Sequence, residues 1–448
     1  MPKCPVREAM RNDAPGRPPR ARPPRARSPR ALGAARRPPG ARAARATLLA
    51  LGPAFVAAIA YVDPGNVAAN LTAGARFGYL LLWVLIVANA IAVLVQYQSA
   101  KLGLVTGRSL PELLGDRLKD GPRRLYWVQA ELVAAATDIA EVLGGAIALQ
   151  LLFGIPLLLG GLIVGVASMG LLLVQSHRGQ RSFELVIIAL LAVIVVGFVT
   201  GLFFSGLDPV AAVAGIVPRF QGTDSVLLAT SMLGATVMPH AIYLHSTLAR
   251  DRHGDSVVDG IRDEGRIAAL LRATRWDVAG ALFVAGAVNI AMLLLAASSL
   301  RGIGGTDSIE GAHAAVVATL GPVVGAIFAI GLLASGLAST SVGTYAGSAI
   351  MGGLIKIRVP LLARRVITLI PALIVLGIGF DPTRALVLSQ VVLSFGIPFA
   401  MIPLVRYASS RAIMGQFANA TWLRIAGWIS AGLIIVLNTL LIVLVVGG

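Results

Sequence analysis

The chain has 448 residues, of which 56% are apolar and only 13% are charged, and its formal net charge at pH 7 is +17. This composition excludes an ordinary soluble domain, and several stretches exceed the roughly 20 apolar residues that a helix needs to cross a bilayer. The single cysteine, Cys4, leaves no disulfide within one chain and no thiolate metal site. Any transition-metal site must therefore use oxygen, nitrogen or thioether ligands.

Residues 1–46 differ from the rest of the chain. They contain ten Pro, 12 Arg and one Lys against Glu8 and Asp13. Because such a segment cannot bury a core, we expect a disordered basic tail in the cytoplasm, with a transit peptide or a misassigned start as alternatives. No aromatic residues are interleaved with the basic loops elsewhere, so nucleic acid is not an expected partner.

From Thr47 onward the sequence predicts an all-α membrane domain, 47–448, with eleven hydrophobic segments. They cover approximately 47–76, 79–104, 125–152, 156–175, 183–205, 225–250, 275–300, 313–340, 365–380, 384–405 and 421–447. Alternate loops are rich in Lys and Arg, whereas the opposite loops hold little beyond Arg219, Arg301 and Arg384. The positive-inside rule then predicts a plasma-membrane (bacterial inner-membrane) protein with a cytoplasmic N-terminus and an external C-terminus.

The first segment is interrupted by Asp63-Pro64-Gly65-Asn66. A charged residue at membrane depth is costly and is a functional hypothesis by default. Pro64 lacks an N–H and Gly65 tolerates unusual backbone angles, so the helix is expected to break and to free carbonyl groups, such as that of Ala60. Broken backbone at this depth is tolerated only where it is buried in protein or lines a wet cavity.

The sixth segment has a second interruption, at Met238-Pro239-His240. Pro239 leaves the carbonyl of Ala235 without its helix partner, and Met238 lies within about one turn of that carbonyl. Broken segments at matching positions in two halves indicate a transporter site, and an offset of five segments predicts an inverted repeat. The repeats would span about 47–205 and 225–405, with one extra helix at 421–447.

Asp63, Asn66, Met238 and the freed carbonyls would together form a mixed cage of carboxylate, amide, carbonyl and sulfur. Oxygen ligands alone would suit Mg²⁺ or Ca²⁺, whereas a soft thioether favours transition ions. A methionine in a membrane helix is usually core filler, but its place between the second break and the charged first break favours a ligand. His240 is expected to handle protons or support the helix rather than to bind metal, and His245 is expected to pack.

The two interruptions resemble the paired signature of the Nramp family of divalent-metal transporters. The resemblance covers the chain from about Thr47 and implies a LeuT-like fold with proton-linked uptake of Mn²⁺ or Fe²⁺. It also implies that Asp63, Asn66, Met238 and the Ala235 carbonyl are metal ligands, and that Gln390 helps to coordinate the metal in some states. No resident cofactor is expected, because metal and protons are the transported substrates.

Segment 125–152 carries Glu131, Asp138 and Glu141, whose spacing places all three on one helical face. The hypothesis is a wet proton relay, and the alternative is structural pairing inside the protein. The family resemblance places the residue matching Glu141, with His240, near the metal and on the proton path. It also makes Arg364 and Arg365 the counter-charge of Asp138.

One departure from the family pattern is Leu337-Ala338, where family members usually have a Gln-Ser pair. The loss of this polar pair is expected to alter gating or the proton route. An organic-solute symporter or an Mg²⁺ transporter on the same fold remains the alternative function. No nucleophile–base pattern or metalloprotease spacing indicates a membrane enzyme.

Overall fold

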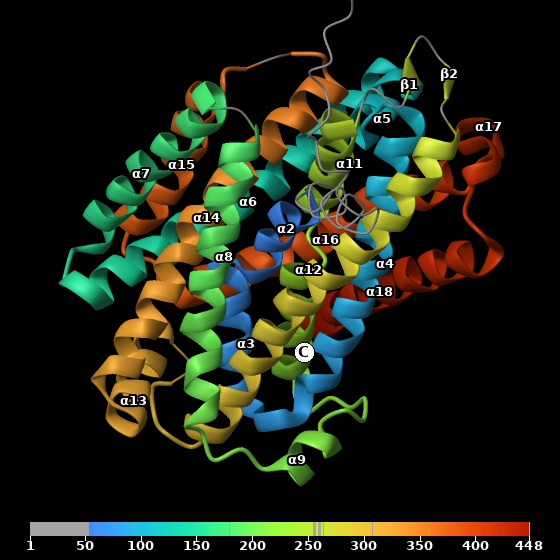
Figure 1. The fold of residues 1–448 in the computed structure, drawn as a ribbon. Helices are drawn as coiled ribbons and strands as arrows, with labels where there is room; N and C mark the ends of the chain where they lie inside the picture. Colours follow the sequence, from blue (N-terminus) through green and yellow to red (C-terminus); the bar gives the residue numbers. More distant parts are fainter. Residues whose placement is uncertain are drawn as a thin grey trace, which may run out of the picture. The chain divides into compact units, whose positions relative to one another are not determined.

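The computed structural model describes residues 53–178, 180–253, 257–258, 261–262, 264–306, 308–357 and 359–447, and these are almost wholly helical (Figure 1). The predicted tail, 1–46, and the start of the first expected segment lie outside the described residues. Among the residues described, the only sheet is a two-stranded antiparallel one, formed by β1 (Val257–Val258) and β2 (Ile261–Arg262).

The first half of the described chain forms α2 (Pro53–Ile59), η1 (Ala60–Val62), α3 (Pro64–Phe77), η2 (Gly78–Leu81), α4 (Leu82–Thr106), α5 (Leu110–Arg117), α6 (Asp120–Phe153), α7 (Leu157–Arg178), α8 (Gln180–Phe203) and α9 (Pro209–Ala214). The second half forms α10 (Gly222–Thr236), α11 (Pro239–His253), α12 (Glu264–Ser299), α13 (Ile309–Leu320), α14 (Pro322–Leu354), α15 (Leu361–Gly377), α16 (Pro382–Ala408), α17 (Arg411–Met414), η4 (Gly415–Phe417) and α18 (Thr421–Gly447).

Eight helical stretches of the described residues are long and apolar enough to cross a membrane. Three shorter apolar helices, Pro53–Val62, Leu157–Leu173 and Ile309–Leu320, fall below that length. The fold is therefore that of a multi-pass membrane protein, and the count of eleven spans stays a prediction.

The expected segment 313–340 has the wrong boundaries. Gly321, with a φ of 93°, separates α13 from α14, and Pro322 begins a helix that continues to Leu354. Glycine adopts a positive φ at little cost and proline is favoured in the first turn of a helix, so this pair starts a new helix. The sequence predicted a single segment here because the residues on both sides of Gly321 are apolar.

The helices that surround Asp63 are held close together by glycines. A β-carbon at Gly144 of α6 would overlap the ring of Pro64, and one at Gly65 would overlap the side chain of Gln390 on α16. A β-carbon at Gly234 of α10 would overlap the carbonyl oxygen of Gln390. α6 and α16 thus pack against the start of α3, and α10 packs against both α16 and α3, so these helices lie around the first interruption.

We predict that Gly234→Ala lowers the thermal stability of the detergent-solubilised protein, because the new methyl group meets backbone that cannot rotate away. Overpacking of this kind costs about 1–3 kcal/mol. Gly432→Ala on α18 is the matched control, since a β-carbon there meets nothing within 4 Å. Melting curves followed by tryptophan fluorescence would measure both, and equal melting temperatures would contradict the close packing.

Candidate functional site

The first interruption lies at Asp63, where the backbone is extended with φ −75° and ψ 168°. Helix η1 ends before it and α3 begins after it, with Pro64 in the first turn. The Asp63 carboxylate caps α3, because its Oδ1 accepts hydrogen bonds from the Asn66 backbone N–H at 2.7 Å and from Asn66 Nδ2 at 2.9 Å. The extended residue thus aims a buried carboxylate at the positive end of a helix.

Two carbonyl groups freed before Asp63 are captured by side chains that the sequence analysis did not select. Asn289 Nδ2 of α12 donates to the Tyr61 carbonyl at 2.7 Å, and Ser335 Oγ of α14 donates to the Val62 carbonyl at 2.6 Å. Asn289 is also 3.0 Å from Asn70 Nδ2. Asn289 could have been selected from the sequence, because it is an amide inside an apolar segment. Ser335 could not, because a serine in a membrane helix can form a hydrogen bond within its own helix.

The second interruption lies between Thr236, which ends α10, and Pro239, which begins α11. Val237 at the break has φ −109° and ψ 64°. Since Pro239 has no N–H, the Ala235 carbonyl is free to accept another donor. That donor is Asn66 Nδ2 at 2.9 Å, and Thr236 Oγ1 is 3.4 Å from Asn66 Oδ1. Asn66 therefore joins the two interruptions directly.

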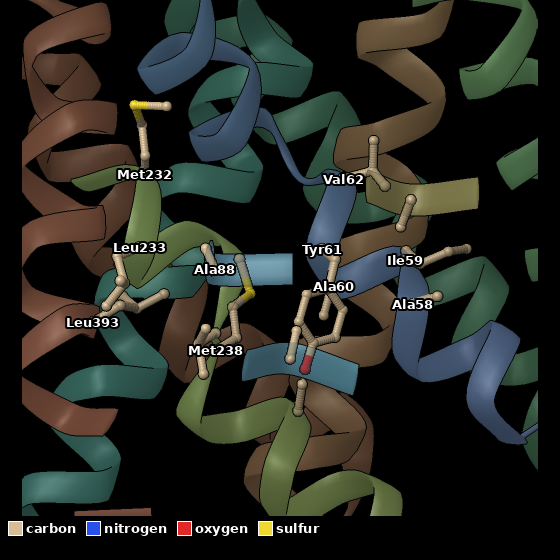
Figure 2. Close-up of a cluster of buried hydrophobic side chains, with 14 of the residues drawn as sticks. Ala58, Ile59, Ala60, Tyr61, Val62, Ala88, Met232, Leu233, Met238 and Leu393 are labelled. Atoms are coloured by element: carbon tan, nitrogen blue, oxygen red, sulfur yellow. The ribbon is translucent and has the colours of Figure 1, made fainter. Parts of the chain in front are cut away.

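Met238 and Ala60 lie at the two breaks and belong to one buried cluster. Both residues are buried, with exposed fractions of 0% and 1%. Figure 2 shows the Met238 side chain extending from the second break beside the Tyr61 ring, whereas Met232, on α10, points away from that ring. The Met238 thioether is therefore buried at the second break, in the same cluster as the end of the first broken helix.

Gln390 on α16 also reaches the site. It is fully buried, and its Nε2 is 3.4 Å from Asp63 Oδ2. Its Oε1 has no hydrogen-bond partner among the described residues. A buried acceptor without a donor is costly, so this oxygen is suited to a cation or a proton donor.

Asp63 supplies the one carboxylate among the donors named above. No cationic side chain of the described residues pairs with its carboxylate, although the residue has an exposed fraction of 0%. Among the described residues, no three or more His, Cys, Asp or Glu side chains lie close enough together to hold a metal ion. One carboxylate among neutral amide and carbonyl groups makes this a weakly charged environment.

The three acids of α6 lie on one side of that helix, and two of them form ion pairs with α15. Arg365 Nη1 is 3.2 Å from Asp138 Oδ1, and Arg364 Nη2 is 2.7 Å from Glu131 Oε1. The arginines thus divide between two acids instead of both facing Asp138. Arg365 Nε also donates to Ser168 Oγ of α7 at 2.9 Å, a partner that sequence reasoning missed.

Glu141 forms no ion pair with any of the described residues. Its carboxylate lies against Gly343 of α14, and its Oε2 accepts no hydrogen bond from the described residues. It stands one helical turn from Gly144, the residue that contacts Pro64. The acidic side of α6 therefore reaches the first interruption at Glu141.

The two histidines of α11 have different neighbours. His240 Nδ1 is 3.4 Å from Thr137 Oγ1 of α6, and its Nε2 has no partner among the described residues. His245 Nδ1 is 2.7 Å from Gln96 Oε1 of α4, and Gln96 in turn contacts the Tyr61 hydroxyl. His245 is buried and hydrogen-bonded between helices, whereas His240 lies between the second break and the acidic helix.

Known proteins share this architecture. The solved structure of a manganese transporter from Eremococcus coleocola is 31% identical and has a TM-score of 0.79, covering 90% of this chain and 87% of that one. MhsT, solved with L-phenylalanine, is only 14% identical, yet it covers 86% of this chain and 98% of its own with a TM-score of 0.58. The chain therefore has the LeuT-like fold of membrane transport proteins.

Sequence comparison gives the family. The model for natural resistance-associated macrophage protein-like (Nramp) proteins matches residues 54–444. The divalent metal cation transporter MntH of Mycobacterium tuberculosis (strain ATCC 25618 / H37Rv) is 60% identical over 402 residues, covering 89% of this chain and 92% of the relative. The Bacillus subtilis (strain 168) transporter of the same name is 47% identical over 404 residues, covering 90% of this chain and 93% of its own. The chain belongs to the Nramp family, which confirms the resemblance inferred from the two interruptions.

The Asp138–Arg365 pair makes a prediction about stability. Removing one member leaves an uncompensated buried charge, which costs about 3–5 kcal/mol, so Asp138→Asn and Arg365→Gln should each lower the melting temperature markedly. The double variant should lose less than the sum of the two single losses, because neither charge remains. Differential scanning fluorimetry of the four proteins measures this coupling, and strictly additive losses would show that the pair does not interact.

Proposed function

We propose that this protein is a proton-coupled symporter that imports divalent transition-metal ions, with Mn²⁺ as the main substrate and Fe²⁺ also accepted. The observation that carries the proposal is the fully buried carboxylate of Asp63, which has no cationic partner among the described residues and is linked through Asn66 to the freed Ala235 carbonyl. The Mycobacterium tuberculosis relative is named a divalent metal cation transporter, and the Eremococcus coleocola neighbour a manganese transporter. Both names support a divalent metal as cargo.

The metal ligands would be Asp63, Asn66, Met238 and the Ala235 carbonyl, with Ala60 and Gln390 contributing in some conformations. Asn66 Nδ2 now bridges Asp63 Oδ1 and the Ala235 carbonyl, at 2.9 Å from each. Rotating this amide by 180° would bring Asn66 Oδ1 to the same place, and three oxygens would then converge beside the Met238 sulfur. Such a rotation exchanges hydrogen bonds for metal bonds without moving the backbone.

The sulfur would select the ion. Ca²⁺ and Mg²⁺ take oxygen ligands and gain nothing from a thioether, whereas Mn²⁺ and Fe²⁺ accept mixed ligands. One carboxylate offsets half the charge of a divalent ion, which keeps binding reversible. The described residues contain no cluster of thiolate or imidazole ligands. This fits a protein that releases its metal ion better than one that stores it.

Protons would load on Asp63 or Glu141, with His240 beside them, and leave along Asp138 and Glu131. These acids become more accessible in that order, from 1% for Glu141 and 2% for Asp138 to 27% for the Glu131 side chain. Ten helical residues separate Glu141 from Glu131, or about 15 Å at 1.5 Å per residue. Arg364 and Arg365 would balance the charge of the two outer acids within the protein.

Alternating access would rock the two broken segments, α2–η1–α3 and α10–α11, against a scaffold that includes α6 and α14. This movement assumes the inverted repeat of about 47–205 and 225–405, with α18 added outside it. A plasma-membrane location with a cytoplasmic N-terminus gives the inward direction, because each positive charge gains about 2.3 kcal/mol per 100 mV of negative interior potential.

A first prediction concerns ion selection. In proteoliposomes with acidic exterior, wild type should take up Mn²⁺, Asp63→Asn should lose uptake almost completely, and Met238→Ala should let Ca²⁺ compete. Met232→Ala is the matched control, because Met232 is equally buried but points away from the site (Figure 2). If Ca²⁺ stays excluded in Met238→Ala, the sulfur does not select the ion, and if wild type moves no Mn²⁺, an organic solute or Mg²⁺ becomes the leading substrate.

A second prediction concerns proton coupling. Glu141→Gln should keep measurable Mn²⁺ binding but lose most of the acceleration of uptake that an inward proton gradient produces, because the proton relay loses its innermost carboxylate. Mn²⁺ flux and internal pH would be recorded together with trapped dyes. Glu264→Gln, on an exposed residue at the start of α12, should leave both signals unchanged. A Glu141→Gln protein that still acidifies the lumen with Mn²⁺ entry would remove Glu141 from the path.

A further inference from the structure

We propose that a pocket lined by Arg219 and Arg301 binds the phosphate headgroup of an anionic phospholipid, whose acyl chain lies in an adjoining groove beside α18. The pocket has a volume of about 470 Å³ and lies among η2, α9, the segment before α10 and the segment after α12. Figure 1 shows α9 at the end of the helices remote from α5. This site is separate from the metal cage and does not depend on the proposed function.

The pocket carries uncompensated positive charge. Both arginines are exposed, and no carboxylate of the described residues forms an ion pair with either. The nearby acids are engaged elsewhere, since Asp224 pairs with Arg76 at 2.5 Å and Asp208 accepts hydrogen bonds from the first N–H groups of α9 at 2.9 and 3.1 Å. Two guanidinium groups are thus available for one anion, and guanidinium matches phosphate geometry well.

The fold brings these arginines to one pocket although they are 82 positions apart in sequence. The Arg301 side chain packs over Gly78, which has a φ of 60° and where a β-carbon would lie 2.9 Å from Arg301 Nη1. Both residues also belong to the loops that are otherwise poor in Lys and Arg. Basic residues in these loops reduce the difference in Lys and Arg content that sets the orientation of the protein in the membrane. Their meeting in one pocket therefore indicates a role other than topology.

An apolar groove continues from the pocket. It has a volume of about 120 Å³ between α4, α10 and α18. Its lining is Trp83, Val84, Val87, Phe220, Leu233, Leu433, Val436, Leu437 and Leu440. Phe220 borders both the pocket and the groove, and its ring meets that of Trp83 edge to face at 5.4 Å.

Trp83 ties the groove to the basic pocket, because its Nε1 donates to the Arg219 carbonyl at 3.4 Å. Tryptophan favours the membrane interface, where its ring is apolar and its N–H is wet. A positive pocket that opens into an apolar groove on the side of a membrane helix matches a phosphate headgroup with a chain attached. A soluble phosphate would use the arginines and leave the groove empty.

The test is native mass spectrometry of the full chain in detergent, titrated with dioleoyl phosphatidylglycerol or with dioleoyl phosphatidylcholine. Wild type should retain one phosphatidylglycerol per chain in clear preference to phosphatidylcholine. Each Arg→Gln change at Arg219 or Arg301 should weaken phosphatidylglycerol about fivefold, the value expected for one basic residue near an anionic lipid. Arg384→Gln, an exposed arginine outside the pocket, is the control and should change nothing.

The acyl chain is tested on α18. Leu433→Trp should fill the groove and weaken phosphatidylglycerol, whereas Ile435→Trp, on an exposed residue outside the groove lining, should not. If wild type shows no preference for phosphatidylglycerol, or if Arg384→Gln weakens it as much as the pocket variants do, the site is overturned. If millimolar inorganic phosphate displaces the lipid and Leu433→Trp has no effect, the pocket binds a free anion and the lipid proposal fails.

Discussion

The structure depends on one constraint, which is that backbone groups released at two helix breaks must find partners away from water. The breaks satisfy this constraint largely through each other and through neighbouring side chains. Asn66 after the first break donates to the Ala235 carbonyl before the second, while Asn289 and Ser335 take the carbonyls of Tyr61 and Val62. Breaking either helix elsewhere would leave polar backbone unpaired at membrane depth, at several kcal/mol per group.

Glu131, Asp138 and Asp63 differ in their partners. Asp138 and Glu131 each face an arginine of α15, so their charges are balanced within the protein. Asp63 has neutral hydrogen-bond donors around it and no cationic partner among the described residues. Of these three acids, only Asp63 has no cationic side chain of the described residues to balance its charge.

Much of this arrangement was predictable from sequence, because the costly residues are few and conspicuous. Asp63 with Pro64, and Met238 with Pro239, violate the rules for membrane helices, and their residue types indicate what they are suited to bind. The division of Arg364 and Arg365 between two acids was not predictable, since adjacent residues on a helix point in different directions and only the packing of α15 on α6 decides their partners. The roles of Ser335 and Ser168 were hidden for the same reason, and the boundary at Gly321 was hidden by apolar residues on both sides.

The central claim is that Asp63, Asn66, Met238 and the Ala235 carbonyl enclose the transported ion. The most direct test is a crystal grown with Mn²⁺ and measured at the manganese absorption edge, where anomalous scattering locates the ion. Our account predicts one strong peak within bonding distance of the Asp63 carboxylate and the Met238 sulfur, lost in Asp63→Asn. A peak among Glu131, Asp138 and Glu141 instead, with none at Asp63, would contradict it.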